Sequence, residues 1–342
     1  MVTKIGLDLG YSNITISDVT MGIYREPSIA LINKETRRIV SVGRKAVPAD
    51  DGKAPEDGVL VRPFKNGLFF DRQITEGILE SAISAVLPAE RVRCVIGVPS
   101  DILPKQEREL FRMMHEAGVA DCYSVNRAMA ALIGAGYSPL MSVISVNVGA
   151  SSTEILIIYR GQIIYAAREK IGGEDFDQAV RSYILEQGDV NISLSVARAI
   201  KERLGAVWQG KESESIEIEG TLSLTGNKVR MSVTTEDIVG VFENPIHKLF
   251  MAIADGVKAI PLDMVAEIFE NGIVLTGGGA LIYGLDVMTN QVLGIPVKQP
   301  DNPMDSVARG LSRINSYIPM RTRSNNKNIT SQIAKYYESR KA

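Results

Sequence analysis

The first part of the chain alternates short apolar runs with polar turns, which is typical of strands. The first strand is expected over residues 4–8, and residues 12–19 alternate polar and apolar side chains. This pattern predicts a hairpin across the glycine turn between the two segments. Residues 27–32 predict a third strand. Residues 33–70 are interrupted by charges and prolines, and we expect a small inserted subdomain there.

Helical spacing then alternates with strand spacing. Apolar residues recur at helical intervals over 74–87, and 92–98 is a continuous apolar run that stops at Pro99. Residues 104–117 combine charges with an apolar face. These patterns predict a helix, a buried strand and an amphipathic helix, in that order.

The second half repeats this plan. Its expected elements are strands over 142–148, 154–159 and 162–169, a helix that opens at 172–177, a second inserted subdomain with short strands over 208–233, and a helix capped by 234–237. A strand–hairpin–strand core that occurs twice, with one insertion in each copy, predicts an α/β protein of two duplicated domains.

We therefore expect a first domain over 1–140, with its insertion at about 33–70. The second domain spans 141–320, with its insertion at about 178–250. Residues 321–342 form a polar, basic tail with a possible short helix over 329–340. We expect this tail to be solvated and partly disordered, and the alternative is a basic segment that docks on a partner or a lipid surface.

Composition excludes several classes of function. The 342 residues are 45% hydrophobic and 23% charged, with a net charge of −2, which gives no electrostatic case for nucleic acid. Cys94 and Cys122 are too few for a disulfide framework, and His115 and His247 lie too far apart to suggest a zinc site. With no signal peptide or long apolar stretch, we expect a cytoplasmic protein and only peripheral membrane contact.

Three glycine turns carry the candidate chemistry. Gly6–Gly10 closes the first strand, Gly149–Ser152 follows the apolar run 143–148, and Gly277–Gly279 follows the apolar run 273–276. Glycine lets backbone amides approach a phosphate closely. Three such turns, spread from end to end of the chain, predict one nucleotide held between the two halves.

A collinear series of short stretches gives these turns a context. The stretches are Gly6–Gly10, Arg25–Ser28, Val42–Gly43, Arg62–Gly67, Val95–Ser100, Met129–Gly136, Gly172–Gly173, Gly272–Leu281 and Val307–Gly310. Together they resemble the actin, Hsp70 and sugar-kinase ATPase superfamily, and within it bacterial actins of the MreB type, over everything before the tail. The resemblance implies duplicated actin-like (ribonuclease H-like) domains with a nucleotide cleft between them.

The resemblance also implies ATP and Mg²⁺ as ligands. Residues implied in nucleotide binding are Gly6, Asp8, Gly10, Tyr11, Ser12, Asn13, Gly149, Ala150, Ser151, Ser152, Gly172, Gly173, Lys201, Glu202, Gly277, Gly278, Gly279 and Ala280. The first two turns would hold phosphates, and Asp8 would orient the magnesium ion through water. The third turn would cradle the nucleoside. Lys201 and Glu202 would contact the ribose or base, with an ordinary solvated helix face as the alternative.

The departures from the family fall on its chemistry. MreB-type proteins usually carry a glutamate where Arg127 stands, just before Met129–Ala131, and an aspartate where Asn147 stands. Arginine has no acceptor and cannot serve as a base, and asparagine lacks the carboxylate charge. Ala150 and Ser151 replace a glycine pair. We therefore expect weak or impaired ATP hydrolysis, the alternative being drift in a site that works through other residues.

By the same resemblance, the expected function is a head-to-tail cytoskeletal filament for cell shape or intracellular organisation. Membrane-associated morphogenesis proteins are its implied partners, although the candidate membrane loop 86–91 offers little apolar area. A specialised magnetosome-type filament and a non-polymerising adaptor with an actin fold are the alternatives. A kinase or a chaperone ranks last, because we find neither a base for a sugar hydroxyl nor a separate substrate domain.

Overall fold

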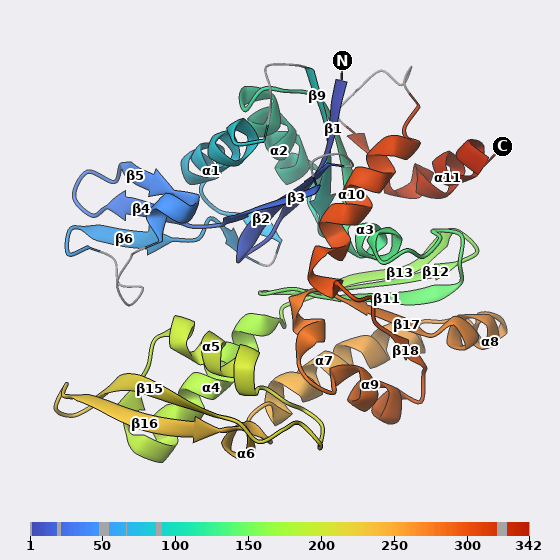
Figure 1. Ribbon diagram of the computed structural model, residues 1–342. Helices are drawn as coiled ribbons and strands as arrows, with labels where there is room; N and C mark the ends of the chain where they lie inside the picture. Colours follow the sequence, from blue (N-terminus) through green and yellow to red (C-terminus); the bar gives the residue numbers. More distant parts are fainter. Residues whose placement is uncertain are drawn as a thin grey trace.

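The computed structural model describes residues 2–18, 22–47, 55–65, 67–86, 91–319 and 327–341. The chain is arranged as two halves, each built around a β-sheet that is flanked by helices (Figure 1). A small sheet projects from each half on the same side of the molecule. This is the duplicated α/β plan that the sequence predicts.

The first large sheet has the strand order β19-β10-β9-β1-β2-β3. Its strands are β1 (Val2–Leu9), β2 (Asn13–Asp18), β3 (Gly22–Pro27), β9 (Arg91–Val98), β10 (Val119–Asn126) and β19 (Lys327–Asn328). β1 pairs antiparallel with β2 and parallel with β9, so its carboxyl end lies at the turn into β2. Helices α1 (Arg72–Ser84) and α2 (Pro104–Glu116) bury apolar side chains such as Ile78 and Phe111 against it.

The second large sheet has the strand order β13-β12-β11-β17-β18. Its strands are β11 (Val143–Val148), β12 (Thr153–Tyr159), β13 (Gln162–Glu169), β17 (Ile273–Thr276) and β18 (Val297–Lys298). The helices of this half are α4 (Gly173–Gly188), α5 (Leu194–Leu204), α7 (Glu243–Lys258), α8 (Leu262–Asn271) and α9 (Leu285–Leu293). The register of β11 against β12 and β17 places its carboxyl end beside the turn that follows β17.

Helices α3 (Arg127–Gly134) and α10 (Ser306–Tyr317) lie between the two sheets (Figure 1). They cross so closely that a Cβ on Gly134 would come within 1.7 Å of the Ser306 carbonyl oxygen, and one on Gly310 equally close to that of Ala130. Only glycine permits this approach. The chain thus returns late in the sequence to pack α10 against β1 and β9 of the first half.

The inserted segments form the two small sheets. The first contains β4 (Ala30–Asn33), β5 (Ile39–Val42) and β6 (Gly58–Val61), followed by the hairpin β7 (Phe64–Lys65) and β8 (Leu68–Phe69). The second contains β14 (Val190–Asn191), β15 (Ser215–Leu222) and β16 (Lys228–Thr234), followed by α6 (Thr235–Ile238). Short 3₁₀ turns occur at Gly43–Ala46, Gly278–Leu281, Pro303–Asp305 and Thr330–Gln332. The exact domain boundaries given above stay predictions.

The prediction of a third core strand over 27–32 is wrong. The third strand is β3, which ends at Pro27, and Ala30 already begins β4 of the small sheet. Proline lacks an amide hydrogen, which explains why the ladder ends there. The alternating apolar residues Ile29 and Leu31 belong to the inserted sheet rather than to the core.

The tail is ordered where it is described, contrary to the expectation of a solvated segment. β19 pairs parallel with β10, and α11 (Ile333–Lys341) packs against α10. Ile329 and Ile333 are fully buried, which accounts for this docking, because each removes an apolar side chain from water. The short helix expected over 329–340 is α11, which begins at Ile333 after the 3₁₀ turn Thr330–Gln332. Residues 320–326 lie outside the described part.

Two observations bear on membrane contact. Within the residues that the structure describes, no helix is both long and apolar enough to cross a bilayer. The candidate membrane loop over 86–91 falls mainly on residues 87–90, which lie outside the described residues.

Candidate nucleotide site

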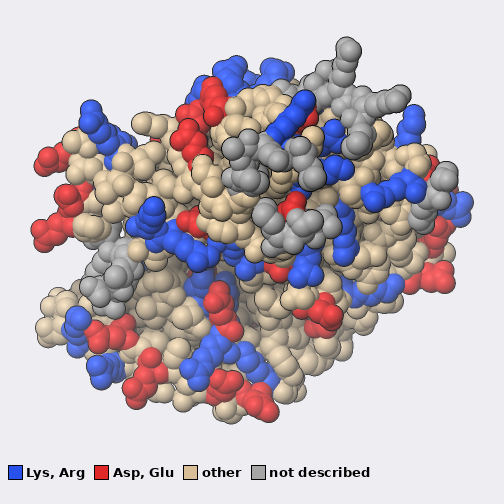
Figure 2. Space-filling view, turned by 45° about the horizontal axis from the view of Figure 1, so that its top comes forward, with Lys and Arg blue, Asp and Glu red and all other residues tan. Residues whose placement is uncertain are grey.

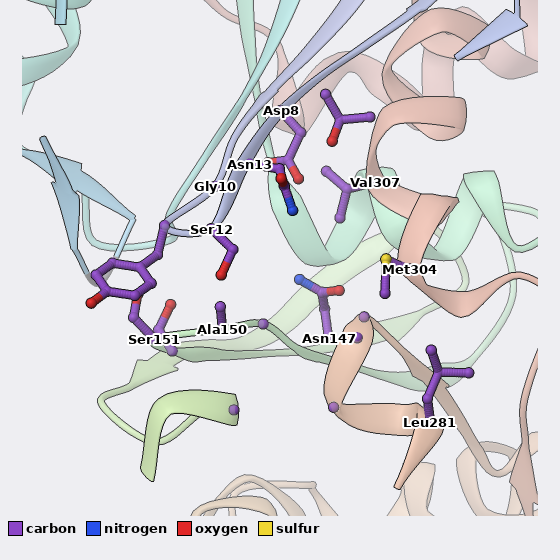
Figure 3. A pocket seen from close by; sticks show the side chains of 18 of the residues that line it. Asp8, Gly10, Ser12, Asn13, Asn147, Ala150, Ser151, Leu281, Met304 and Val307 are labelled. Carbon is purple, nitrogen blue, oxygen red and sulfur yellow. The ribbon is translucent and has the colours of Figure 1, made fainter. Parts of the chain in front are cut away.

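The first glycine turn joins β1 to β2 at the edge of the cleft. The Gly10 amide donates to the Asn13 carbonyl oxygen at 3.0 Å, and a Cβ on Gly10 would come within 2.7 Å of that oxygen. The Ser28 hydroxyl donates to the Gly10 carbonyl oxygen at 2.7 Å. These bonds hold the turn in a tight conformation, in which Tyr11 and Ser12 line the cleft. Figure 3 shows Ser12 directed into it.

The second turn joins β11 to β12 and is bonded to the start of α4. The Gly149 amide donates to the Ser152 carbonyl oxygen at 2.9 Å. The amides of Gly173 and Glu174 donate to the carbonyl oxygens of Gly149 and Ala150 at 2.9 and 2.7 Å. These bonds bring the amino end of α4, where a helix favours negative charge, to the same turn.

The third turn follows β17 and is fixed by a close approach. Gly277 has a φ of +85°, and a Cβ there would come within 2.3 Å of the Val148 carbonyl oxygen. The position therefore requires glycine on both counts. It holds the third turn directly beside the end of β11.

These three turns and helix α5 line one cavity of about 440 Å³ between the two halves (Figure 3). The predicted residues that line it are Asp8, Gly10, Tyr11, Ser12, Asn13, Arg127, Asn147, Gly149, Ala150, Ser151, Ser152, Gly173, Lys201, Glu202, Gly277, Gly278 and Gly279. Figure 2 shows the molecule hollowed between its halves, with Lys and Arg side chains at the edges of the hollow.

Three predicted residues do not line the cavity. Gly6 faces α10, where a Cβ would come within 2.4 Å of the Ser312 nitrogen, so its small size serves helix packing. Gly172 caps α4 behind the second turn, with a Cβ position 2.8 Å from the Gly149 carbonyl oxygen. Ala280 is buried behind the third turn.

Several further residues that line the cavity were not predicted from the sequence. They are Thr15, Arg25, Gly67, Glu154, Arg198, Leu281, Ile282, Met304 and Val307. Two had a usable signal. Glu154 is the second residue after the second turn. Arg198 precedes Lys201 by three residues, which places Arg198 and Lys201 on one face of a helix.

Arg127 reaches across the base of the cavity to Asp8. Asn126 accepts a hydrogen bond from the Met129 amide at 3.1 Å and caps α3, so Arg127 is the first residue of the helix. Its Nε donates to Asp8 Oδ1 at 3.0 Å, and its Nη2 donates to the Leu9 carbonyl oxygen at 2.7 Å. Burial raises the pKa of Asp8, and the charge of Arg127 opposes that rise. Arg127 and Asp8 thus form an ion pair at the base of the cavity.

Glu154 is a buried carboxylate at the same end of the cavity. Its Oε2 accepts hydrogen bonds from the amide and hydroxyl of Ser100, both at 3.3 Å, whereas Oε1 has no partner among the described residues. Burial raises the pKa of Glu154 to about 7, although the charge of Arg127 pulls it down. A carboxyl group that titrates near neutrality can accept or release a proton at physiological pH.

Asn147 points into the cavity from the opposite side to Asp8 (Figure 3). Its Oδ1 accepts a hydrogen bond from the Thr276 hydroxyl at 3.3 Å, so the carbonyl oxygen is held toward β17. The side chain is neutral, as expected from the sequence, and contributes no charge to the site.

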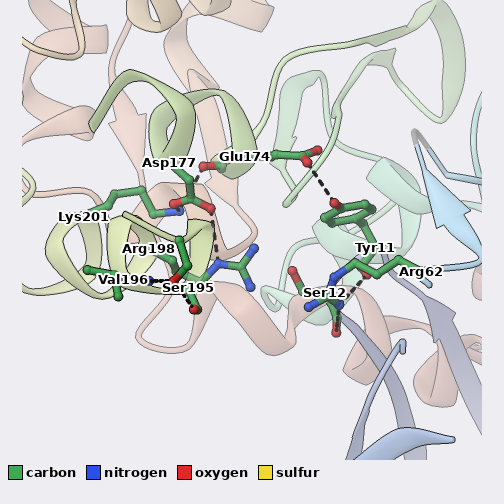
Figure 4. A network of polar contacts seen from close by, with 11 residues as sticks. Tyr11, Ser12, Arg62, Glu174, Asp177, Ser195, Val196, Arg198 and Lys201 are labelled. Atoms are coloured by element: carbon green, nitrogen blue, oxygen red, sulfur yellow. Dashed lines mark hydrogen bonds and ion pairs between the residues drawn. The ribbon is translucent and has the colours of Figure 1, made fainter. Parts of the chain in front are cut away.

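At the far wall of the cavity, two basic side chains pair with one carboxylate. Asp177 of α4 is buried and pairs with Lys201 at 2.6 Å and with Arg198 at 3.2 Å (Figure 4). Lys201 also donates to the Gly173 carbonyl oxygen at 3.0 Å. Lys201 is therefore anchored to α4 and is not on a solvated helix face, whereas Glu202 is exposed at the cavity rim.

Polar contacts join the two halves across the cleft. Tyr11 donates to Glu174 Oε1 at 2.8 Å, and burial together with this bond raises the pKa of Tyr11 to about 12 (Figure 4). Arg168 Nε donates to Asp101 Oδ1 at 2.7 Å and lowers the pKa of Asp101. A cavity bounded by such contacts can close around a ligand that both halves touch.

The model of the MreB/Mbl protein family matches residues 2–323. The chain belongs to the MreB/Mbl family. It is 31% identical over 321 residues to the cell shape-determining protein MreB of Pasteurella multocida, covering 90% of this chain and 91% of that relative. It is 29% identical over 313 residues to the cell shape-determining protein Mbl of Bacillus cereus, covering 90% and 93% of the two chains.

Two solved structures have the same fold as this chain. MreB5 of Spiroplasma citri bound to AMPPNP superposes with a TM-score of 0.87 at 24% identity, over 92% of this chain and 96% of that one. The MamK double helical filament gives a TM-score of 0.78 at 21% identity, over 93% and 100% of the two chains. The MreB/Mbl chain described here is thus a divergent bacterial actin homologue, and the predicted fold is confirmed.

Proposed function

We propose that this chain binds a nucleoside triphosphate, ATP by the family resemblance, between its two domains. The observation that carries the proposal is the convergence of three glycine turns, from both ends of the sequence, on one cavity. Its volume of about 440 Å³ is in the range of small-molecule sites. The amino end of α4 and the cations Arg127, Arg198 and Lys201 suit a polyanion.

Relatives support the choice of ligand. Solved structures of Spiroplasma citri MreB5 are bound to AMPPNP and to ADP.

The resemblance also implies Mg²⁺ at Asp8, through water. The residues present do not fit that part, because the one carboxylate assigned to the metal is already ion-paired with Arg127. Nucleotide binding is therefore the proposal, without a step that depends on a metal.

The second part of the proposal is a cytoskeletal filament that assembles head to tail. A ligand touched by both halves holds them in one relative orientation, and a fixed orientation presents matching end surfaces. Related proteins are named as cell shape-determining, and MamK forms a double helical filament. Cell shape or intracellular organisation, in the cytoplasm and in contact with morphogenesis proteins at the inner membrane face, is the role we infer.

The third part is weak hydrolysis. Arg127 stands where the family has a glutamate, and it donates a hydrogen bond to Asp8, whereas a glutamate would offer an acceptor to water. Asn147 lacks the charge of the family aspartate. Loss of an aligned catalytic group commonly costs roughly 100-fold in rate. We infer a filament that keeps its triphosphate for long periods.

One observation favours a second candidate, a non-polymerising adaptor that uses the actin fold to sense nucleotide. The tail docks on the sheet edge as β19 and α11, and it follows the last residue matched by the family model. An added element at an edge is a place where a partner can bind. A magnetosome-type filament remains a variant of the first proposal.

The test is sedimentation of the purified chain with ATP, ADP or no nucleotide, with phosphate release measured in the same tubes. Pelleting with ATP and little phosphate release is expected. Rapid release would contradict the assignment of Arg127 and Asn147 as degenerate positions. Nucleotide binding without pelleting would favour the adaptor, and the absence of any nucleotide binding would overturn the proposal.

A further inference from the structure

The buried ion pair of Arg127 and Asp8 changes the charge at the place where the family resemblance puts a divalent cation. The Arg127 side chain is only 8% exposed and that of Asp8 20%, with 3.0 Å between Nε and Oδ1. A guanidinium cannot lose its proton at physiological pH. A divalent cation at Asp8 would therefore sit against a fixed positive charge of the protein itself, with little water to screen the repulsion.

Of the neighbouring groups only Glu154 can offset this charge, and burial raises its pKa to about 7, so it is only partly ionised at neutral pH. Asn147 is neutral, and Glu154 gives its Oε2 to the amide and hydroxyl of Ser100. Within the described ranges, no group of three or more His, Cys, Asp or Glu side chains could hold a metal ion. The side chains around Asp8 therefore suit the guanidinium group of Arg127, which is already paired with Asp8, better than a metal ion.

The backbone around Arg127 is shaped to hold this side chain. A Cβ on Gly67 would come within 2.5 Å of Arg127 Nη1, and one on Gly97 within 3.1 Å of its Cγ. Gly67 has a φ of +74°, where side chains are disfavoured. The two glycines leave a slot for the guanidinium, and the bond from Nη2 to the Leu9 carbonyl oxygen fixes its plane.

The same side chain is directed at the ligand space. Arg127 lines the cavity together with the first turn, and its bonds to Asp8 and Leu9 use two of its five N–H groups. Guanidinium groups match phosphate oxygens well, and hydrogen bonds between charged groups are the strong ones. A triphosphate in this cavity would contact Arg127 at the position where a metal ion would otherwise neutralise the negative charge of its phosphates.

We propose that Arg127 takes the place of the divalent cation, so that this chain binds a nucleoside triphosphate without a metal ion. The inference rests on the proposed nucleotide binding and adds to it how the phosphate charge is neutralised. Asp8 then acts as the positioning residue for Arg127 instead of as a metal ligand.

The experiment measures the affinity of the full chain for a fluorescent ATP analogue, once with EDTA and once with excess MgCl₂. We expect the two dissociation constants of the wild type to agree within about threefold, since the main counter-charge belongs to the protein. Arg127→Glu should lose roughly 10- to 100-fold in affinity in EDTA, the range for hydrogen bonds between charged groups, and regain part of it with Mg²⁺. Arg230→Glu, which makes the same charge change on the exposed strand β16, is the control and should bind as the wild type does.

Two results would overturn the inference. Binding by the wild type that requires Mg²⁺ would show that the metal is still needed while nucleotide binding itself stands. Absence of binding in both buffers would remove the proposed function together with this inference.

A second variant keeps the test valid if Arg127→Glu does not fold. Asp8→Asn keeps the side-chain size and removes the carboxylate. If Asp8 only positions Arg127, the variant should bind the analogue at least as tightly as the wild type. The asparagine Oδ1 can still accept the bond from Arg127 Nε, and a negative charge near the phosphates is gone. A loss of affinity seen with Mg²⁺ but not with EDTA would assign a metal to Asp8 and contradict the proposal.

Discussion

The phenol of Tyr11 donates a hydrogen bond to Glu174 across the cleft, with 2.8 Å between the two oxygens. Tyr11 belongs to the first glycine turn and Glu174 to the first turn of α4, so this bond joins the parts of both halves that we propose face the phosphates. Lys65 adds a weaker ion pair to the same carboxylate at 3.7 Å. Closure of the cleft is therefore coupled to the two segments that a nucleotide would contact.

Removal of this bond should speed the release of nucleotide. In Tyr11→Phe the halves lose one half-buried hydrogen bond, which is typically worth about 0.5–1.5 kcal/mol. The rate of release should rise roughly 2- to 13-fold if the bond is intact only in the closed form. Stopped-flow displacement of a fluorescent ATP analogue measures it.

The matched control for this prediction is Tyr24→Phe. Tyr24 donates to Glu26 Oε2 at 2.7 Å, but both residues lie on β3 within the first half. This variant loses a similar bond without affecting closure. An equal acceleration in both variants would show that the Tyr11–Glu174 bond does not hold the cleft closed.

Glu154 should make the folding stability fall between about pH 4.5 and pH 7. Its pKa is about 7 in the folded protein and 4.5 in the reference state, so the folded form binds the extra proton in this interval. Stability falls with rising pH wherever the folded state holds more protons. The favourable contribution is complete below pH 4.5 and is lost as the pH rises through 7, with an upper size of about 3 kcal/mol.

Glu154→Gln tests this contribution, because glutamine cannot titrate. The variant should be more stable than the wild type above pH 7, where the wild type holds a buried carboxylate, and the difference should shrink toward pH 4.5. Thermal unfolding of both proteins over this pH range gives the comparison, in which the other titrating groups cancel. A difference in melting temperature that does not change with pH would contradict the high pKa.

ATP hydrolysis should become clearly faster only when Arg127 and Asn147 are both changed to the family residues. Asn147→Asp alone adds a carboxylate but leaves Arg127 beside Asp8, so we expect no more than a small change in phosphate release. The double variant Asn147→Asp/Arg127→Glu restores both family side chains and should hydrolyse ATP at least about tenfold faster with Mg²⁺. A double variant as slow as the wild type would mean that other residues limit the rate.

The glycine turns of the site could be predicted from the sequence, whereas the pairing of its charged side chains could not. Each glycine turn follows a segment rich in β-branched residues, and that local pattern is enough to predict a strand that ends in a tight turn. Gly6 shows the limit of this logic. It belongs to the same motif, but it faces α10, which comes from residues 306–317, and no local pattern reports that contact.

The ion pairs of the site could not be predicted because they join distant segments. Arg127 and Asp8 are 119 residues apart within the first half, and the Tyr11 hydroxyl reaches Glu174 only after the two halves have packed. Lys201 is a similar case, since its spacing fits a solvated helix face as well as a ligand site. The buried Asp177 on the neighbouring helix decides between the two interpretations.

The tail should contribute to stability although it lies beyond the residues matched by the family model, which ends at 323. Ile329 and Ile333 are fully buried between α10 and the edge of the first sheet, so Ile333→Ala should cost about 2–5 kcal/mol and lower the melting temperature by several degrees. Glu338→Ala, on the exposed face of the same helix, should leave the melting temperature unchanged.

Because the Thr330 hydroxyl accepts a bond from the Asn126 amide at 2.9 Å, loosening of the tail should also speed hydrogen exchange at Asn126. Unchanged melting and exchange in Ile333→Ala would mean that the tail does not dock in solution, and would return it to the solvated segment expected from its polar composition.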